Sequence, residues 1–353
     1  MTSRIRAHVF AAMAMLVGCL WPPLTTSAQT SSVPLRIGFF NAENLFDCQH
    51  DSLTDDFEFL PDGRRRWTPA RYYTKLRRVA EVIASMGSDD VPALVGLCEV
   101  ENDSCLTDLT RHSPLRAAAY SYVMSHGDDP RGIDVALLYR PAFFHLLHAA
   151  EHAVPVHDVR RDAYARPMLH VSGVLLTGDT LDVLVCHWPS RLHGTHASEP
   201  LRSMAASVVQ AVCDSLLAVR TKALVLVMGD FNEPPTGPSV ARLEDGDRLV
   251  NLARTAQPMY PPKRRSDCNG TYRYKGRREQ LDQMLVSPAL AAHLPTSDNG
   301  SIPALTIYNA TFLLEREPIY GGLRPYRTYI GLRYHSGYSD HLPVFADFLL
   351  PLD

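Results

Sequence analysis

The sequence predicts a layered α/β or α+β domain. Three observations support this prediction: many short apolar runs, two longer runs with helical spacing, and no proline- or glycine-rich linker after residue 35. Short buried strands covered by a few helices form the layers of such domains. With 353 residues, of which 46% are hydrophobic and 21% charged, the chain is long enough for a large core. We predict one domain over residues 35–353.

The first predicted elements are a strand over 35–40, a polar loop over 50–68 and a helix over 70–86. The helix is predicted because apolar side chains recur at Leu76, Val79 and Ile83, a spacing of i, i+3 and i+7. Gly87 ends it.

A second helix is predicted over 201–219. Most other apolar runs have the length of strands. They cover residues 92–98, 134–139, 169–176, 181–186, 223–228, 281–286 and 344–349.

Polar side chains follow these apolar strands at the point where each strand ends. They are Asn41, Glu99, His187, Asp230 with Asn232, Asp282, and Asp340 with His341. Because strand ends of one sheet meet in space, these groups could line one pocket. Carboxylates and amides bind hard cations such as Mg²⁺ or Mn²⁺, and imidazoles serve acid–base chemistry. Together they are suited to hydrolysis of a phosphate ester.

A resemblance becomes specific when the motifs are taken in order. They are Phe40–Asp47 (Phe-Asn-Ala-Glu-Asn-Leu-Phe-Asp), Leu97–Val100, Cys186–Arg191, Gly229–Asn232, Leu281–Gln283 and Ser339–His341. This set resembles the endonuclease/exonuclease/phosphatase superfamily, in particular its exported bacterial branch. The resemblance implies a deoxyribonuclease I-like α/β fold, a four-layer sandwich of two packed mixed sheets flanked by helices.

The resemblance also implies one divalent-metal site, for Mg²⁺ or Mn²⁺. In that arrangement Glu99 is the principal ligand, and Asn41 supports both metal and phosphate. Asp340 would lie beside the metal, and Glu43 is expected near the same site.

Four further residues would carry the chemistry by the same resemblance. Asp230 would position or deprotonate the attacking water, and Asn232 would bind phosphoryl oxygens. His341, held by Asp282, would act as base or electrostatic stabiliser.

The leaving group would be protonated with the help of His187. A carboxylate on an earlier strand orients this histidine in the deoxyribonuclease branch, and Asp134 is the nearest candidate. Arg191 and Asn44 are predicted to bind substrate; the alternatives are a surface charge and a loop residue.

Two segments combine arginine with aromatic residues. One covers residues 64–78 and the other residues 324–335. Such a mixture can grip phosphates and stack on bases, or it can pack loops onto the sandwich. The sequence leaves both interpretations open.

Residues 1–28 are predicted to be an export signal. Two arginines precede an apolar run over 9–20 that is too short to span a bilayer comfortably. Two processing sites stay open: cleavage after Ala28, or a lipobox that makes Cys19 a lipid anchor. No later segment is long and apolar enough to cross a membrane. We expect a periplasmic protein, an outer-membrane lipoprotein or a secreted protein.

The charge balance is mildly acidic. The whole chain has 35 basic and 38 acidic residues; without Arg4 and Arg6 of the signal, 33 basic residues remain and the formal charge is −5. This argues against non-specific nucleic-acid binding driven by a basic face, although a nuclease with local positive charge stays open.

We therefore predict an exported, metal-dependent phosphodiester hydrolase that acts as a monomeric endonuclease on DNA or RNA. The first alternative is the same chemistry on a small or lipid phosphate, as in a phosphatase or sphingomyelinase-like enzyme. The second is a binding protein on an inactive scaffold, which the intact set of polar strand-end residues argues against.

Overall fold

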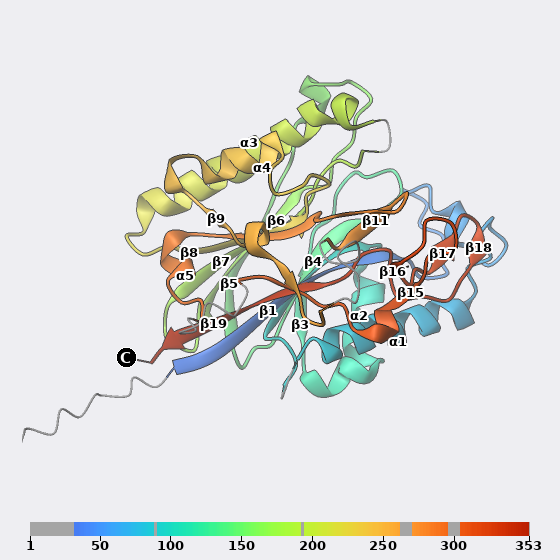
Figure 1. Cartoon of the computed structure of the whole chain (residues 1–353), viewed down its shortest axis with the longest axis horizontal. Helices are drawn as coiled ribbons and strands as arrows, with labels where there is room; N and C mark the ends of the chain where they lie inside the picture. The colour runs from blue at the N-terminus through green and yellow to red at the C-terminus, as the bar shows by residue number, and fades with distance from the viewer. Residues whose placement is uncertain (1–31, 88–89, 192–193, 262–269, 296–303, 353) are drawn as a thin grey trace, which may run out of the picture.

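Two mixed β-sheets pack face to face, and helices cover the outer face of each (Figure 1). The computed structural model describes residues 32–87, 90–191, 194–261, 270–295 and 304–352. Figure 1 shows α3 and α4 on one side of the two sheets and α1 and α2 on the other. The predicted four-layer α/β sandwich is confirmed. The predicted export signal lies outside the described residues.

Sheet A has seven strands among the described residues. In order across the sheet they are β10 (Gln257–Pro258), β14 (Thr306–Ile307), β19 (Val344–Pro351), β1 (Ser32–Leu45), β2 (Leu94–Val100), β4 (Asp134–Tyr139) and β3 (Ser121–Met124). The sheet is mixed, because β1 runs parallel to β2 and antiparallel to β19.

Sheet B has six strands among the described residues. In order they are β5 (Phe144–His152), β6 (Met168–Leu175), β7 (Thr180–His187), β8 (Leu224–Asp230), β13 (Asp282–Val286) and β9 (Val250–Asn251). Here β7 and β8 are parallel, whereas β8 and β13 are antiparallel.

Three two-stranded hairpins stand outside the two sheets. They are β11 (Tyr272–Tyr274) with β12 (Arg277–Glu279), β15 (Leu314–Arg316) with β16 (Leu323–Pro325), and β17 (Tyr329–Ile330) with β18 (Arg333–Tyr334). The α-helices are α1 (Pro69–Ser85), α2 (Asp103–Arg111), α3 (Thr195–Val219), α4 (Pro238–Ala241) and α5 (Pro288–Ala291).

The main core lies between the sheets and continues under α1. Phe39 of β1 and Leu226 of β8 belong to one buried cluster, together with Val79 of α1. At Gly96 of β2 the sheets come close, because a Cβ there would lie 2.8 Å from Cε of Met228. A second core fills the space between sheet B and α3.

Every predicted strand and both predicted helices are found, most of them with shifted ends. Helix α3 begins at Thr195, six residues before the predicted start, and includes Pro200 in its N-terminal part. Residues His196–Val219 are long and apolar enough to span a membrane by length and composition alone. The inner face of α3, including Ala206 and Val209, packs on the second core, so the helix is accounted for as a covering layer of sheet B.

Candidate active site

In sheet B, regular strand pairing brings three predicted site residues together. Asp230 at the end of β8 lies opposite His187 of β7 on one side and opposite Asp282 of β13 on the other. Residues in such register point to the same face of a sheet. All three side chains are buried. Sheet B therefore supplies one imidazole and two carboxylates on neighbouring strands, with Asp230 in the middle.

Sheet A contributes residues from strands whose ladder is irregular. The β1–β2 register shifts between Asn41 and Leu45, and Glu43, Asn44 and Glu99 have positive φ angles of 50°, 55° and 62°. Non-glycine residues adopt this region at a cost of about 1–3 kcal/mol each, mostly at functional sites. The bulges turn the Asn41 and Glu99 side chains toward sheet B.

The two halves meet at Asn41. Its amide nitrogen lies 3.2 Å from Oδ2 of Asp230 and 3.4 Å from Oε1 of Glu99, so one side chain bonds to a carboxylate of each sheet. The other carboxylate oxygen of Glu99 accepts from the backbone N–H of Asn44 at 3.0 Å. The predicted metal ligand Glu99 is therefore fixed at both oxygens.

His341 is held from both directions. Its Nδ1 lies 2.8 Å from Oδ2 of Asp282, and its Nε2 lies 3.7 Å from Oδ2 of Asp230. Burial alone would lower the pKa of His341, but the carboxylates of Asp282 and Asp230 outweigh it and hold that pKa well above its usual value. The loop is fixed as well, because the Ser339 hydroxyl donates to the Asn41 carbonyl and accepts from the His341 N–H.

Asp230 lies at the centre of the site. Burial and the neighbouring Asp282 raise the pKa of Asp230 to about 6, against the opposing effect of His341. Its Oδ1 accepts from the backbone N–H of Asn232, which has a φ of 50°, and the Asn232 amide donates to the Trp188 carbonyl. Asn232 is thus rigidly placed beside Asp230.

His187 has a different environment from His341. Its Nε2 lies 3.9 Å from carboxylate oxygens of both Glu99 and Asp230. Burial and the cations of Arg166 and Arg131 hold the pKa of His187 well below its usual value. A neutral imidazole at the site follows from this environment.

The predicted partner of His187 is engaged elsewhere. The Asp134 carboxylate accepts hydrogen bonds from the Ser125 hydroxyl at 2.8 Å and from the Gly127 N–H at 3.0 Å. Among the described residues, Nδ1 of His187 has no hydrogen-bond partner. The orientation of His187 by Asp134 stays a prediction.

Glu43 and Asp340 belong to a compact cluster of charges with two cations. Arg327 pairs with Asp340 at 2.5 Å and lies 3.6 Å from Glu43, and Lys75 lies 3.9 Å from Glu43. The buried ammonium of Lys75 also donates to the Thr328 hydroxyl at 2.6 Å. Two carboxylates are thereby balanced by two cations at the rim of the site.

Lys75 links α1 to the loop that carries His341. Its ammonium donates to the carbonyl of Tyr338, at the start of the Tyr-Ser-Asp-His sequence. Burial lowers the pKa of Lys75 to about 8, although Glu43 and Asp340 act to raise it.

Arg191 is paired within the protein. Its guanidinium forms two bonds to the Glu279 carboxylate on β12. On the same hairpin the Tyr272 ring lies against the His341 ring, with centroids 4.8 Å apart. Arg191 therefore fixes the hairpin beside the site in this structure, and its contact with substrate stays a prediction.

The two segments that combine arginine with aromatic residues pack on each other. The guanidinium of Arg71 lies 4.4 Å from the ring centroid of Tyr334, and that of Arg65 lies 4.9 Å from that of Tyr329. These cation–ring contacts connect α1 and the residues just before it to hairpin β17–β18. Arg327, from the second segment, instead contacts Glu43 and Asp340 at the site. The packing interpretation therefore accounts for most of both segments.

Two places could hold a divalent cation. One is formed by Glu99 with Asn41; in the other, ligand atoms of Asp230, Asp282 and His341 lie within 4.8 Å of one another. Carboxylate oxygens suit Mg²⁺ or Mn²⁺. At the first place the Asn41 amide nitrogen faces Glu99, and the amide oxygen accepts from the Glu43 N–H at 2.9 Å.

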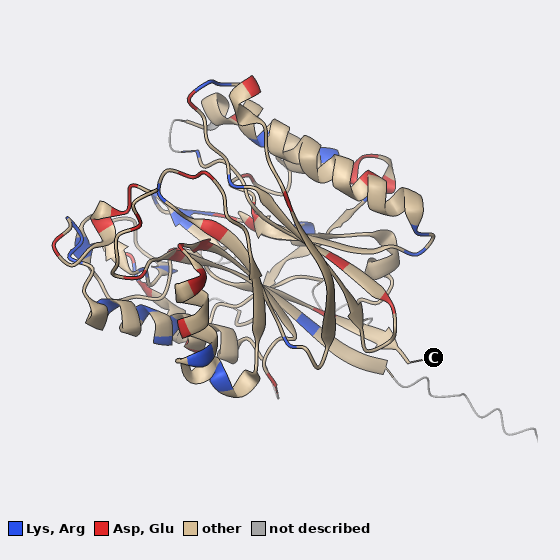
Figure 2. Ribbon diagram, turned by 180° about the vertical axis from the view of Figure 1, so that it is seen from behind, with Lys and Arg blue, Asp and Glu red and all other residues tan. Residues whose placement is uncertain are grey.

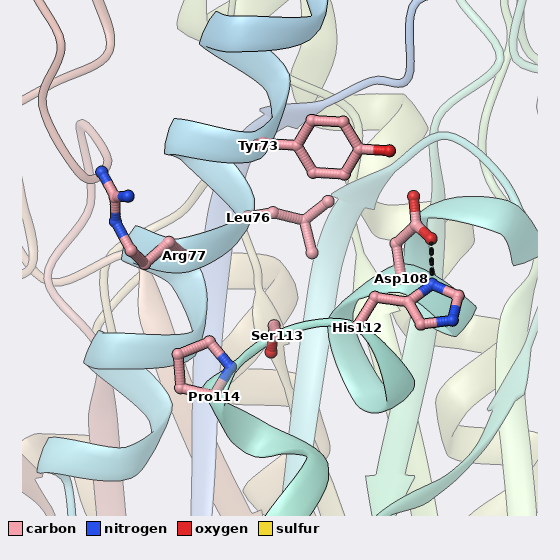
Figure 3. A pocket seen from close by; sticks show the side chains of 7 residues that line it. All are labelled: Tyr73, Leu76, Arg77, Asp108, His112, Ser113 and Pro114. Carbon is pink, nitrogen blue, oxygen red and sulfur yellow. Dashed lines mark hydrogen bonds and ion pairs between the residues drawn. The ribbon is translucent and has the colours of Figure 1, made fainter.

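A cavity of about 210 Å³ lies away from these residues, beside α1 and α2 (Figure 3). It is lined by Tyr73, Leu76, Arg77, Asp108, His112, Ser113 and Pro114. Its Asp108 and His112 side chains are paired at 2.8 Å, and the lining includes none of the predicted site residues.

Three site residues were missed as individuals by the sequence analysis: Lys75, Arg327 and Tyr272. A signal existed for Lys75, because it shares the apolar face of α1 with Tyr72, three residues before, and Val79, four residues after. Arg327 lies in the segment over residues 324–335 that combines arginine with aromatic residues, so its segment was marked. No comparable signal marked Tyr272, because its position depends on a hairpin that the sequence did not predict.

Comparisons with known proteins agree with this geometry. The sequence profile of the Endonuclease/Exonuclease/phosphatase family matches residues 36–349. No curated protein matches the chain.

Several solved structures share the fold. An endonuclease/exonuclease/phosphatase family protein from Bacteroides thetaiotaomicron has 17% identity and a TM-score of 0.55, covering 92% of this chain and 97% of its own. TDP2 from C. elegans has 15% identity and a TM-score of 0.54, covering 89% and 75%. The mannosyl-6-phosphatase Bt3783 of Bacteroides thetaiotaomicron has 17% identity and a TM-score of 0.53, covering 90% and 99%.

Proposed function

Because the chain belongs to the endonuclease/exonuclease/phosphatase family, whose members hydrolyse phosphoester bonds, we propose that it is an endonuclease acting on DNA or RNA. The observation that carries the proposal is the convergence of His341, Asp282, Asp230, Asn41 and Glu99 at one end of both sheets. This is the equipment for attack of an activated water on a phosphodiester.

In the proposed reaction Asp230 accepts a proton from the attacking water. Its pKa of about 6 leaves it ionised at neutral pH, yet basic enough to take a proton. The raised pKa of His341 supports an imidazolium that stabilises negative charge on the phosphoryl oxygens, with Asp282 holding the ring. The Asn232 amide is placed to bind the same oxygens.

A divalent cation fits the donor set. Glu99 would hold it, with Asn41 bonded to the same carboxylate, and when bound it would neutralise charge that develops on the phosphate. We propose Mg²⁺ or Mn²⁺ for this place. The buried carboxylates of this region supply the negative potential that such a cation requires, because Glu99 contributes to the raised pKa of Asp230.

His187 is proposed to assist the leaving oxygen. The neutral form favoured by its surroundings can donate a hydrogen bond from one ring nitrogen to that oxygen, and Nε2 faces Glu99 and Asp230. Cations of Arg166 and Arg131 nearby would also favour a negatively charged leaving oxygen.

A phosphatase acting on a small phosphate is the second candidate. It is favoured by the structural likeness to a mannosyl-6-phosphatase. Figure 2 supports neither candidate alone, since Lys and Arg are interspersed with Asp and Glu over the described ribbon. We also propose export, on the basis of the signal predicted in residues 1–28.

The test compares the wild-type protein with His341→Ala, each with Mg²⁺ and with a chelator. Supercoiled plasmid, single-stranded RNA, sphingomyelin and soluble phosphomonoesters are offered in parallel. Nicking of plasmid or RNA that is lost with the chelator and with His341→Ala supports the endonuclease. Turnover of a monoester or of sphingomyelin alone would show that the substrate is not a nucleic acid. If none of the four substrates were turned over, the proposal of a phosphoester-hydrolysing enzyme would be contradicted.

A further inference from the structure

Hairpin β11–β12 is anchored to the site at its base. Tyr272 pairs with His341 in an isolated β-bridge, and the Leu342 N–H donates to the Thr271 carbonyl at 2.8 Å. The bonds between Arg191 and Glu279 fix the second strand. The hairpin therefore starts beside the reacting groups and projects from them.

The neighbouring hairpin β15–β16 holds it in place. Arg273 and Arg278, one on each strand of β11–β12, donate to the same carbonyl of Leu323 at 2.6 and 3.0 Å. Close packing continues to the turn, where Gly276 has a φ of 82° and a Cβ would lie 2.9 Å from Cβ of Tyr320. The tip of β11–β12 is therefore part of a packed pair of hairpins.

The tip presents cations and aromatic rings to solvent. We call Tyr274, Lys275, Arg277 and Tyr320 the hairpin tip; the two tyrosines are 56% and 54% exposed, and Lys275 and Arg277 are exposed as well. Lys275 Nζ lies 5.2 Å from the ring centroid of Tyr274. Within the part of the chain that the structure describes, Lys275 and Arg277 make no ion pair with a carboxylate.

The hairpin tip lies at a definite distance along the strand from the site. Lys275 follows Tyr272 by three residues, and a strand rises about 3.3 Å per residue, so the tip is roughly 10 Å from the base. Phosphates on one nucleic-acid strand recur about every 3.4 Å along the helix axis. Measured along a duplex axis, the separation therefore corresponds to a few nucleotides, and an extended single strand spans it in fewer.

We propose that the hairpin tip binds the substrate strand within a few nucleotides of the phosphate that is hydrolysed. Lys275 and Arg277 contact phosphates, and Tyr274 offers a ring on which a base can stack. The inference rests on the proposed nuclease function and adds the substrate class: a polynucleotide rather than a dinucleotide or small ester. Because the chain is acidic overall, with a formal charge of −3, local cations must supply this attraction.

The test uses Lys275→Ala/Arg277→Ala and, separately, Tyr274→Ala in the purified protein. The control is Arg116→Ala/Lys222→Ala, which removes two exposed cations: one lies in the 3-10 helix Pro114–Ala118, and the other precedes β8 at the end opposite Asp230. Substrates are bis(p-nitrophenyl) phosphate, a dinucleotide and a 12-nucleotide single strand, with kcat/KM measured for each over a range of salt.

We expect the double variant to lose about tenfold in kcat/KM on the 12-nucleotide strand, mainly through KM, because it removes two phosphate contacts. Tyr274→Ala should lose a factor of the same order, because it removes the ring on which a base stacks. The salt slope of log(kcat/KM) should fall by roughly 1.4, at about 0.7 for each phosphate contact on a single strand. Activity on the dinucleotide and the small diester should be unchanged, and the control should match the wild type.

An equal loss on all three substrates would overturn the inference, since the hairpin would then act through His341. No loss on the 12-nucleotide strand would overturn it as well. Failure of the wild type to cleave any oligonucleotide while it hydrolyses the small diester would instead overturn the endonuclease itself. The two failures are thus separated by the wild-type data.

Discussion

The two halves of the site are built in different ways. In sheet B, His187, Asp230 and Asp282 occupy opposite positions of regularly paired strands. In sheet A, Asn41 and Glu99 lie where the β1–β2 ladder is interrupted, and residues at the bulges adopt positive φ angles. Regular pairing places the sheet B side chains close together with ordinary strand geometry. In sheet A, the site residues are placed by bulges whose backbone adopts unfavourable φ angles.

This difference suggests a division of work. The sheet B half contains or contacts the groups with shifted pKa values. The pKa of Asp230 is about 6, and that of His341, which is bonded to Asp282 of sheet B, is well above its usual value. The sheet A half presents Glu99, whose carboxylate oxygens suit a cation and whose position is fixed by the Asn41 amide nitrogen. We infer that sheet B handles protons and sheet A holds the metal, and three variants test that comparison.

The largest effect is expected for Asp230→Asn. Loss of the proton acceptor should lower kcat by about 10³-fold at saturating metal, the range found for general-base catalysis. The folded protein binds a proton on Asp230 more tightly than the unfolded chain does, because its pKa is raised. The neutral variant should therefore be more stable by up to about 3 kcal/mol at pH 7, the equivalent of the shift from 3.8 to about 6, and this gain should vanish below about pH 4.

The measurements are steady-state kinetics and denaturant unfolding of the metal-free protein at both pH values. Asp162→Asn serves as control, since that side chain is 87% exposed. If the Asp230→Asn protein kept its kcat, the assignment of proton transfer to the sheet B half would be contradicted.

A smaller effect, about 10²-fold in kcat, is expected for Asp282→Asn. Without that carboxylate, the pKa of His341 should fall toward its ordinary value. If catalysis requires His341 as an imidazolium, the alkaline limb of the pH–rate profile should move to lower pH. The acidic limb near pH 6, assigned to Asp230, should stay in place. An alkaline limb that does not move would show that His341 does not act as a cation.

The smallest effect on activity, about tenfold, is expected for Lys75→Met. This change removes the ammonium that holds the Tyr338 carbonyl and leaves Glu43 with one cation fewer. The double variant Glu43→Gln/Lys75→Met should recover part of the lost unfolding free energy, because neither charge is then left alone. Equal stability of the single and double variants in denaturant unfolding would refute the coupling.

The polar strand ends could be predicted from the sequence because each follows an apolar run directly. Asp230 and Asp282 illustrate this: once β8 and β13 pair, their register places the two carboxylates together. The fold class followed from the same runs. Roles such as metal ligand or base came from the family resemblance, since residue type alone does not assign them.

Other features depend on tertiary contacts that local sequence does not encode. Strand β5 was missed because its run Phe-His-Leu-Leu-His-Ala-Ala-Glu-His has no β-branched residue and lies at a sheet edge. Arg71 and Arg277 both belong to stretches rich in arginine and tyrosine, yet the first packs on Tyr334 and the second faces solvent. Composition identifies stretches rich in arginine and tyrosine, but the fold determines whether their side chains pack on another element or face solvent.

The division of work between the halves is tested most directly by a metal titration. Binding of Mg²⁺ and Mn²⁺ to the wild type, Glu99→Gln and His341→Gln can be measured by calorimetry without substrate. We predict that Glu99→Gln weakens metal binding by at least 10–100-fold, the loss typical even of a residue that only supports a ligand, and that His341→Gln stays within about threefold of the wild type. The reverse result would place the metal among Asp230, Asp282 and His341 and contradict the account.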